Sequence, residues 1–169
     1  MNTITSRVND FLRQKRIAVV GVSSKRNTPA NGIYRKLKSL RYKVFPVGRS
    51  AGIFENDPCY SDLQTIPSSI DGVIIVTNAD NSEKIVEQCV ALNIPRVWMH
   101  CSAGTTHKVS SESHRSNTSS VSEKAIQLCR KHNIAVIPGA CPLMFCETAD
   151  WFHKSMRWVL SVTGKLRVQ

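Results

Sequence analysis

The chain has 169 residues, of which 41% are hydrophobic and 21% charged, which is ordinary for one globular domain. No apolar run approaches the roughly 20 residues that span a bilayer. The first residues, MNTITSRVNDFLRQKR, are polar and charged, unlike a secretory signal. We therefore expect one domain over 1–169, located in the cytoplasm and without a membrane partner. Six cysteines without a signal are expected to be free thiols.

The net charge of +11 is confined to one part of the chain. The first 50 residues hold twelve Lys and Arg residues against one acid, Asp10, whereas the other 119 hold eleven of each sign. An anionic partner is therefore expected to meet the N-terminal part. Nucleic acid is a disfavoured partner, because aromatic residues are only 7% of the chain and no RNP, KH or helix-turn-helix pattern occurs.

Short apolar runs alternate with amphipathic segments along the chain. In order, we expect a strand over 16–22, a helix over 29–40, a strand over 42–47, a loop over 48–58, a strand over 71–77, a helix over 80–92, a strand over 95–100, a helix over 121–132 and a strand over 134–137. This alternation predicts an α/β fold: a Rossmann-like, doubly wound parallel sheet of about five strands with flanking helices. Such sheets bind ligands at the carboxyl ends of their strands.

Two segments do not follow the alternation. Residues 102–122 contain eleven Ser or Thr and almost nothing apolar, which predicts a flexible Ser-rich surface loop. Residues 149–164 carry aromatic and aliphatic side chains at helical spacing. They predict a C-terminal helix that packs on the sheet or, in a homodimer, on a second subunit.

The turn after the first strand has the features of an anion site. Gly21 allows a sharp turn and the close approach of a phosphate, and Ser23, Ser24 and Lys25 precede the helix that Thr28 caps. The sequence is neither G-x-G-x-x-G nor a P-loop. An ordinary βα turn is the alternative interpretation.

The end of the second strand bears on the choice of cofactor. NAD enzymes place an Asp or Glu there to bind the ribose hydroxyls, whereas this chain has Val47, Gly48 and Arg49. A guanidinium in that place favours a phosphorylated ribose. NADP and coenzyme A (CoA) both carry one, so both remain candidates, and a solvated Arg49 is the alternative.

The order of these segments resembles a known family. The stretches IAVVGVSSKRNTPANGIYRKLKSLRYKVFPVGR, CYSDLQTIP and IDGVIIVTNADNSEKIVEQCVALNIPRVWMH resemble the small stand-alone CoA-binding proteins, which are similar to the CoA-binding domain of the succinyl-CoA synthetase α subunit. The ending IPGACPLMF…ADWFHKSMRWVLSVTGKL is similar to the tail of one branch of the family. The resemblance covers about 15–100 and 134–165. The synthetase's second domain, with its phosphorylated histidine, has no counterpart here.

The resemblance implies that CoA lies across the strand ends. Its phosphates would contact Gly21, Val22, Ser23, Ser24 and Lys25. Its adenosine end would contact Val47, Gly48 and Arg49. Its pantetheine would contact Thr77, Asn78, Ala79, Met99 and His100. Two departures from the family pattern stand out. Family members often have Asn-Pro where this chain has Gly48-Arg49, and the Ser-rich segment is longer than usual.

Residues suited to catalysis or metal binding are few. His100 and Cys101 are adjacent on an expected strand, so their side chains would point to opposite faces. His107 and His114 follow at seven-residue intervals in the Ser-rich segment, without the fixed geometry that a metal site needs. We therefore expect no catalytic residue and no metal.

The first hypothesis is non-catalytic binding of CoA or an acyl-CoA through its nucleotide moiety. The alternatives are an NADP-dependent oxidoreductase and an acyl-CoA ligase subunit that needs a partner chain.

Overall fold

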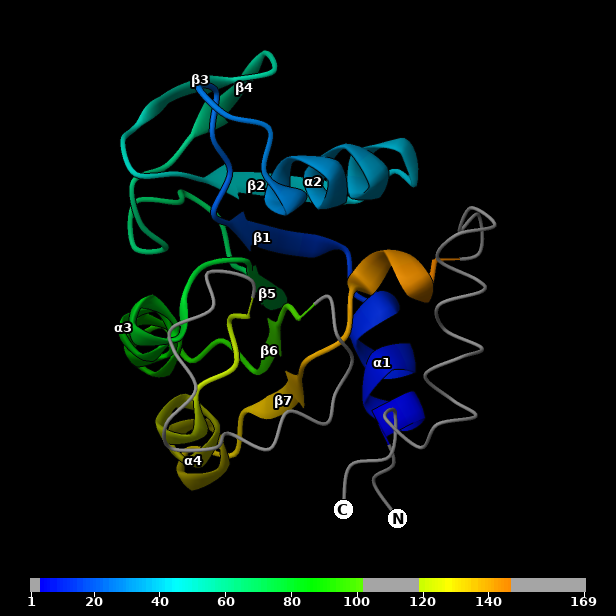
Figure 1. Cartoon of the computed structure of the whole chain (residues 1–169), viewed down its shortest axis with the longest axis vertical. Helices are drawn as coiled ribbons and strands as arrows, with labels where there is room; N and C mark the ends of the chain where they lie inside the picture. The colour runs from blue at the N-terminus through cyan, green and yellow to red at the C-terminus, as the bar shows by residue number, and fades with distance from the viewer. Residues whose placement is uncertain (1–3, 102–118, 147–169) are drawn as a thin grey trace.

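A computed structural model of the chain describes residues 4–101 and 119–146. Its centre is a five-stranded parallel sheet in the order β2-β1-β5-β6-β7 (Figure 1). The strands are β1 (Arg16–Val20), β2 (Lys43–Val47), β5 (Gly72–Ile75), β6 (Arg96–Met99) and β7 (Ala135–Pro138). The helices are α1 (Ile4–Leu12), α2 (Pro29–Ser39), α3 (Ala79–Ala91) and α4 (Glu123–Lys131), with a 3-10 turn η1 (Pro142–Met144). The predicted Rossmann-like α/β class is confirmed.

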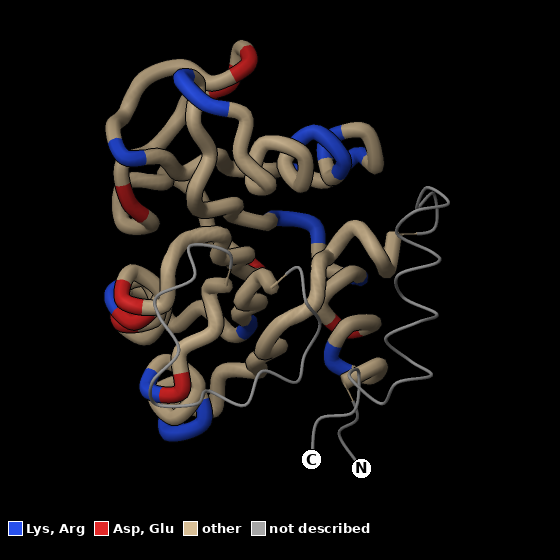
Figure 2. The backbone as a smooth tube through the Cα atoms, viewed as in Figure 1, with Lys and Arg blue, Asp and Glu red and all other residues tan. Residues whose placement is uncertain are grey.

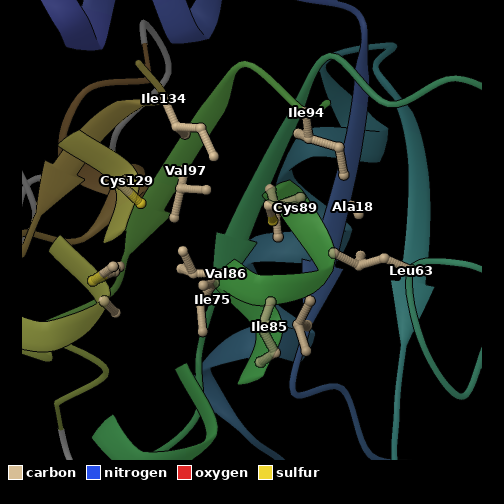
Figure 3. Packing of buried hydrophobic residues seen from close by; sticks show 14 of the residues in the cluster. Ala18, Leu63, Ile75, Ile85, Val86, Cys89, Ile94, Val97, Cys129 and Ile134 are labelled. Atoms are coloured by element: carbon tan, nitrogen blue, oxygen red, sulfur yellow. The ribbon is translucent and has the colours of Figure 1, made fainter. Parts of the chain in front are cut away.

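Helices cover both faces of the sheet. On one face, α3 and α4 pack on one set of strand residues, and Figure 3 shows Val86 and Cys89 of α3 beside Ile75 and Val97 of the strands. On the other face, α1 and α2 pack on the alternate strand residues, among them Ile74 and Trp98. Because successive strand residues point to opposite faces, one apolar run supplies both cores. All six cysteines are free.

The sequence pattern gave no indication of α1. This helix has nine residues, and only Val8 and Phe11 are buried, so its apolar stripe is too short to stand out from a polar segment. Phe11 packs edge-on against Trp98, with 5.5 Å between the ring centroids. A β-carbon at Gly72 would lie 2.7 Å from the Phe11 ring. The glycine is what allows the ring to lie so close to the sheet.

A small hairpin lies in the segment that was expected to be a loop. Strands β3 (Gly52–Phe54) and β4 (Asp57–Cys59) pair antiparallel, and Glu55 and Asn56 both have positive φ at the turn. Two-residue hairpin turns need this backbone but usually take it with Asn-Gly or Asp-Gly. The hairpin packs against α2 through two ion pairs, Arg35–Glu55 and Lys38–Asp57, each 2.6 Å long.

Two further ion pairs lie at the amino ends of the strands. Arg16 of β1 contacts Asp71, just before β5, at 2.5 Å, and Arg96 of β6 contacts Asp10 of α1 at 2.7 Å. The Arg16 side chain holds the pKa of Asp71 down at about 2, below the ordinary value of 3.8. These contacts lie at the edge of the sheet opposite the strand ends where a ligand is expected.

The Ser-rich segment is described only at its end. Ser119 forms an antiparallel bridge to Cys101, Ser120 is buried, and Ser122 caps α4, which begins at Glu123. These last residues are thus fixed rather than part of a flexible loop. Residues 102–118 and the expected helix over 149–164 lie outside the described residues. In the part of the chain that is described, no helix has both the length and the apolar character to cross a membrane.

Candidate functional site

The candidate site lies where the strand order changes direction. The chain passes from β1 to β2 on one side, while β5 joins β1 on the other, so the connections leave the sheet in opposite directions there. In doubly wound sheets this switch point opens a crevice at the carboxyl ends of the strands. The residues that follow β1, β2 and β5 are therefore brought together. They begin with Gly21, Gly48 and Val76.

Gly21 makes the turn at the end of β1. Its φ is +112°, and a β-carbon there would lie 2.1 Å from the carbonyl oxygen of Val76. Its amide donates to the Val47 carbonyl at 2.9 Å, and the Val22 amide donates to the same oxygen at 3.3 Å. No other residue fits at position 21 without moving the backbone, so the sharp turn predicted from the sequence is present.

The loop from Gly21 to the start of α2 is exposed but ordered by hydrogen bonds. Thr28 caps α2, and its hydroxyl lies 3.1 Å from the Gly21 carbonyl oxygen. Within the described residues, the backbone N–H groups of Ser24, Lys25 and Arg26 donate to no other group. These amides precede a helix N-terminus, and the side chains of Lys25 and Arg26 add two positive charges. This combination of groups binds phosphate. Figure 2 shows that Lys and Arg occur in this loop and along α2.

The end of β2 approaches the same loop. Gly48 donates its amide to the Tyr60 carbonyl at 2.9 Å. A β-carbon at Gly48 would lie 3.2 Å from the carbonyl oxygen of Val22 and 3.3 Å from the sulfur of Cys59. Arg49 follows and is exposed. Burial raises the pKa of Cys59, which keeps this thiol protonated at neutral pH.

Two predicted contact residues can offer only their backbone to a ligand. Val22 and Val47 are 5% and 2% exposed and belong to the two cores. Their side chains hold the loop ends to the sheet. Ser24, Lys25 and Arg49 differ from them because their side chains are exposed.

The end of β5 is held by a serine from a distant part of the chain. The Ser120 hydroxyl accepts from the Thr77 amide at 2.9 Å and donates to the Thr77 carbonyl at 2.7 Å. Asn78 caps α3, with its side chain accepting from the Asn81 amide at 3.0 Å. Thr77, Asn78 and Ala79 thus form an ordered rim on the second side of the crevice.

Met99 and His100 are placed differently from the other predicted contacts. Met99 is fully buried in the core on the α3–α4 side, and His100 is 3% exposed. Burial lowers the pKa of His100 to about 4, so its imidazole is neutral at pH 7. Neither side chain lies on the surface of the described structure.

Two residues of the site were missed by sequence reasoning. Asn31, in the first turn of α2, forms several hydrogen bonds with the loop between Gly21 and α2, and its position three residues after the capping Thr28 is the one clue to this role. Ser120 gave no local signal, because its partner Thr77 is 43 residues away. Among the described residues, no group of three or more His, Cys, Asp or Glu side chains is placed to hold a metal ion.

Comparison with known proteins identifies the class. Residues 15–147 match the family model of the CoA binding domain, so the chain belongs to that family. This confirms the resemblance stated above.

Solved structures share the fold. A hypothetical protein from Pyrococcus horikoshii OT3 is 22% identical, over 83% of this chain and 87% of that one, with a TM-score of 0.67. A conserved hypothetical protein from Pyrococcus furiosus is 19% identical, over 76% and 96%, with a TM-score of 0.61. The dinucleotide-forming acetyl-coenzyme A synthetase 1 of Ca. Korarchaeum cryptofilum is 20% identical, over 73% of this chain but 25% of its own, with a TM-score of 0.57.

Proposed function

We propose that this protein binds CoA or an acyl-CoA through its nucleotide moiety, at the carboxyl ends of β1, β2 and β5. Membership of the CoA binding domain family supports the choice of ligand. The observation that carries the location is the loop after Gly21, where backbone N–H groups that have no partner among the described residues precede the N-terminus of α2 beside Lys25 and Arg26. At Gly21 and Gly48 a β-carbon would crowd neighbouring backbone, so the close approach of these strand ends depends on glycine.

In this proposal each strand end takes a different part of the ligand. The amides of Ser24 and Lys25 bind the diphosphate, and the Lys25 ammonium adds charge. Arg49 binds the 3′-phosphate of the adenosine, next to the backbone of Gly48. The rim from Thr77 to Ala79 contacts the pantetheine, with Met99 and His100 behind it in the core.

The protein acts in this proposal as a binding module without chemistry of its own. The described groups near the strand ends are not poised for proton transfer or nucleophilic attack: His100 is buried and neutral, and Cys59 is held as a thiol by burial. Asn78 is engaged as a helix cap. A binding module in the cell would carry, sense or present an acyl-CoA to a protein partner.

One observation favours a second candidate. An Arg after β2, in place of the acid of NAD enzymes, would equally suit the 2′-phosphate of NADP. Binding of NADP would make this protein an oxidoreductase that uses the same crevice. The residues of the site suit both candidates, so the identity of the bound ligand is what distinguishes them.

Thermal unfolding with CoA, NADP and NAD tests the proposal. A ligand at about 100 times its dissociation constant adds roughly 2.7 kcal/mol. At about 2–4 °C per kcal/mol for a domain of this size, saturating CoA should raise the midpoint by several degrees. NAD, without the additional phosphate, should leave it unchanged. A rise with NADP and none with CoA would replace the proposal by the oxidoreductase.

A further inference from the structure

Asn31 is a polar side chain in the first turn of α2, and it is only 3% exposed. A buried side-chain amide is expected to use its full hydrogen-bonding capacity, which is two donors and two acceptor sites. Asn31 does so entirely within the loop from Ser23 to Thr28, which is the phosphate loop of the proposed function. Its oxygen accepts from the Ser23 amide at 3.0 Å and the Thr28 hydroxyl at 2.9 Å, and its nitrogen donates to the carbonyls of Ser23 at 2.9 Å and Arg26 at 3.1 Å.

These four bonds connect both ends of the loop to one point. Ser23 is two residues past the turn at Gly21, and Arg26 and Thr28 are just before α2. Asn31 is itself fixed by the helix, and its own amide donates to the Thr28 hydroxyl at 3.4 Å. The loop is therefore held in one conformation by a side chain that a ligand would not contact directly.

The groups that Asn31 leaves without partners are those that a phosphate needs. The side chain uses the Ser23 amide and two loop carbonyls, while the amides of Ser24, Lys25 and Arg26 stay without a partner in the described structure. An ordered loop does not lose conformational entropy again on binding, so pre-organisation raises affinity without any new contact.

We infer that Asn31 is a positioning residue of the ligand site, which orders the loop from Ser23 to Thr28 so that its N–H groups are ready for the phosphates of the ligand. This inference rests on the proposed CoA function for the identity of the ligand. It adds that affinity depends on a buried amide outside the contact surface.

The experiment replaces Asn31 by an apolar residue of nearly the same shape, Asn31→Leu. The matched control is Gln88→Met, because the Gln88 side chain also fixes a loop to a helix: its oxygen accepts from the Leu63 amide at 3.0 Å, on the α3–α4 face. Both variants lose side-chain hydrogen bonds to a loop, but only the first touches the phosphate loop. The readouts are the dissociation constant for CoA and, without ligand, the rate of tryptic cleavage after Lys25 and Arg26.

We expect Asn31→Leu to weaken CoA binding by about 10- to 100-fold, because the loop then has to be ordered when the ligand binds. Cleavage after Lys25 and Arg26 should become roughly 10-fold faster or more, because cleavage follows the open population of the loop. Gln88→Met should change neither. Asn31→Leu with CoA affinity within about 2-fold of the unmodified protein, or with unchanged cleavage, would overturn the inference.

Two further measurements distinguish a failure of the inference from a variant that does not fold and from a failure of the proposed function. If Asn31→Leu does not fold, Asn31→Asp retains both acceptor contacts and loses only the donors to Ser23 and Arg26, and faster cleavage after Lys25 is again the expected result. Unchanged cleavage in Asn31→Asp would overturn the inference. If the unmodified protein does not bind CoA, the proposed function fails, and the cleavage rates still decide whether Asn31 orders the loop.

Discussion

Gly21 and Val76 lie against each other at the carboxyl ends of the neighbouring strands β1 and β5, so closely that a β-carbon on Gly21 would lie 2.1 Å from the Val76 carbonyl oxygen. We expect Gly21→Ala to force the ends of the two strands apart and to strain a backbone with φ near +112°. The strain alone costs about 1–3 kcal/mol of the free energy of unfolding. CoA binding should be lost together with the turn. Urea unfolding and a CoA titration measure the two effects.

A second glycine provides the control for this substitution. Gly32 lies in α2, and a β-carbon there would meet nothing within 4 Å. Gly32→Ala should therefore stabilise the protein by about 0.5–1 kcal/mol, because alanine is the better helix former. Equal changes in the free energy of unfolding for the two substitutions would show that the close contact at Gly21 does not exclude a larger residue.

Arg49 and Lys25 should differ in the ligand phosphate that they recognise. If Arg49 binds the 3′-phosphate, Arg49→Ala removes a charge-assisted hydrogen bond of about 1.5–3 kcal/mol and weakens CoA binding by roughly 10- to 150-fold. Dephospho-CoA, which lacks that phosphate, should be nearly unaffected. Lys25→Ala should weaken both ligands about equally. Isothermal titration with both ligands compares the four affinities.

The comparison of CoA with dephospho-CoA also detects a non-specific effect of the lost charge. A general loss of positive potential would weaken CoA and dephospho-CoA together, and more strongly at low salt. If Arg49→Ala gives that pattern, or leaves both affinities unchanged, Arg49 belongs to a solvated basic surface. Lys25, Arg26 or Lys43 would then be the next candidates for the 3′-phosphate.

The burial of His100 predicts a loss of stability in mild acid. Its pKa is about 4 in the folded protein, because burial disfavours the charged imidazole, and about 6.5 when unfolded. The unfolded chain therefore binds more protons between these values. Stability is complete above about pH 6.5 and falls toward pH 4 by up to about 1.4 kcal/mol per pH unit.

Urea unfolding between pH 4 and 7 checks this dependence. His100→Leu should flatten the curve in that window. The control His132→Leu changes an exposed residue at the end of α4 and should keep the slope of the unmodified protein. A slope that survives in His100→Leu would assign the acid sensitivity to other groups.

Asp71 should govern stability in a lower range of pH. Its pKa is about 2 in the folded protein, below the ordinary 3.8, because Arg16 and the backbone amides of Arg16 and Lys15 bind the carboxylate. The contribution is present above about pH 4 and is lost as the pH falls toward 2. Asp71→Asn should lower the urea midpoint at pH 7 and reduce its change between pH 4 and 2. Glu87→Gln, at an exposed position in α3, should do neither.

The strands and their order in the chain could be predicted from the sequence, because a parallel strand buried on both faces is a continuous apolar run. The run 16–22 gives β1 together with Gly21, and 71–77 gives β5 together with Thr77. Helices α2, α3 and α4 also followed from the pattern within about two residues, whereas α1 did not. Gly21, Gly48 and Thr77 were thereby placed at one edge of the sheet without any tertiary information.

The features that were missed depend on contacts between distant parts of the chain. The hairpin of β3 and β4 has strands of three residues and a Glu55-Asn56 turn, and it is held by ion pairs to α2 that no local pattern reveals. The burial of His100 depends on neighbours outside its own strand. A polar residue in a helix, such as Asn31, has the same sequence pattern whether it faces solvent or a loop.

Helix α2 contacts both segments that are proposed to bind phosphates of the ligand. Its first turn holds the loop of Lys25, and its later turns hold, through Arg35 and Lys38, the hairpin that follows Arg49. The segments next to Lys25 and Arg49 are therefore both tied to one helix, which helps to fix their spacing before a ligand binds. In the proposed complex, a ligand with two anionic groups at the matching separation would engage both loops at once, whereas a shorter anion would gain from one loop only.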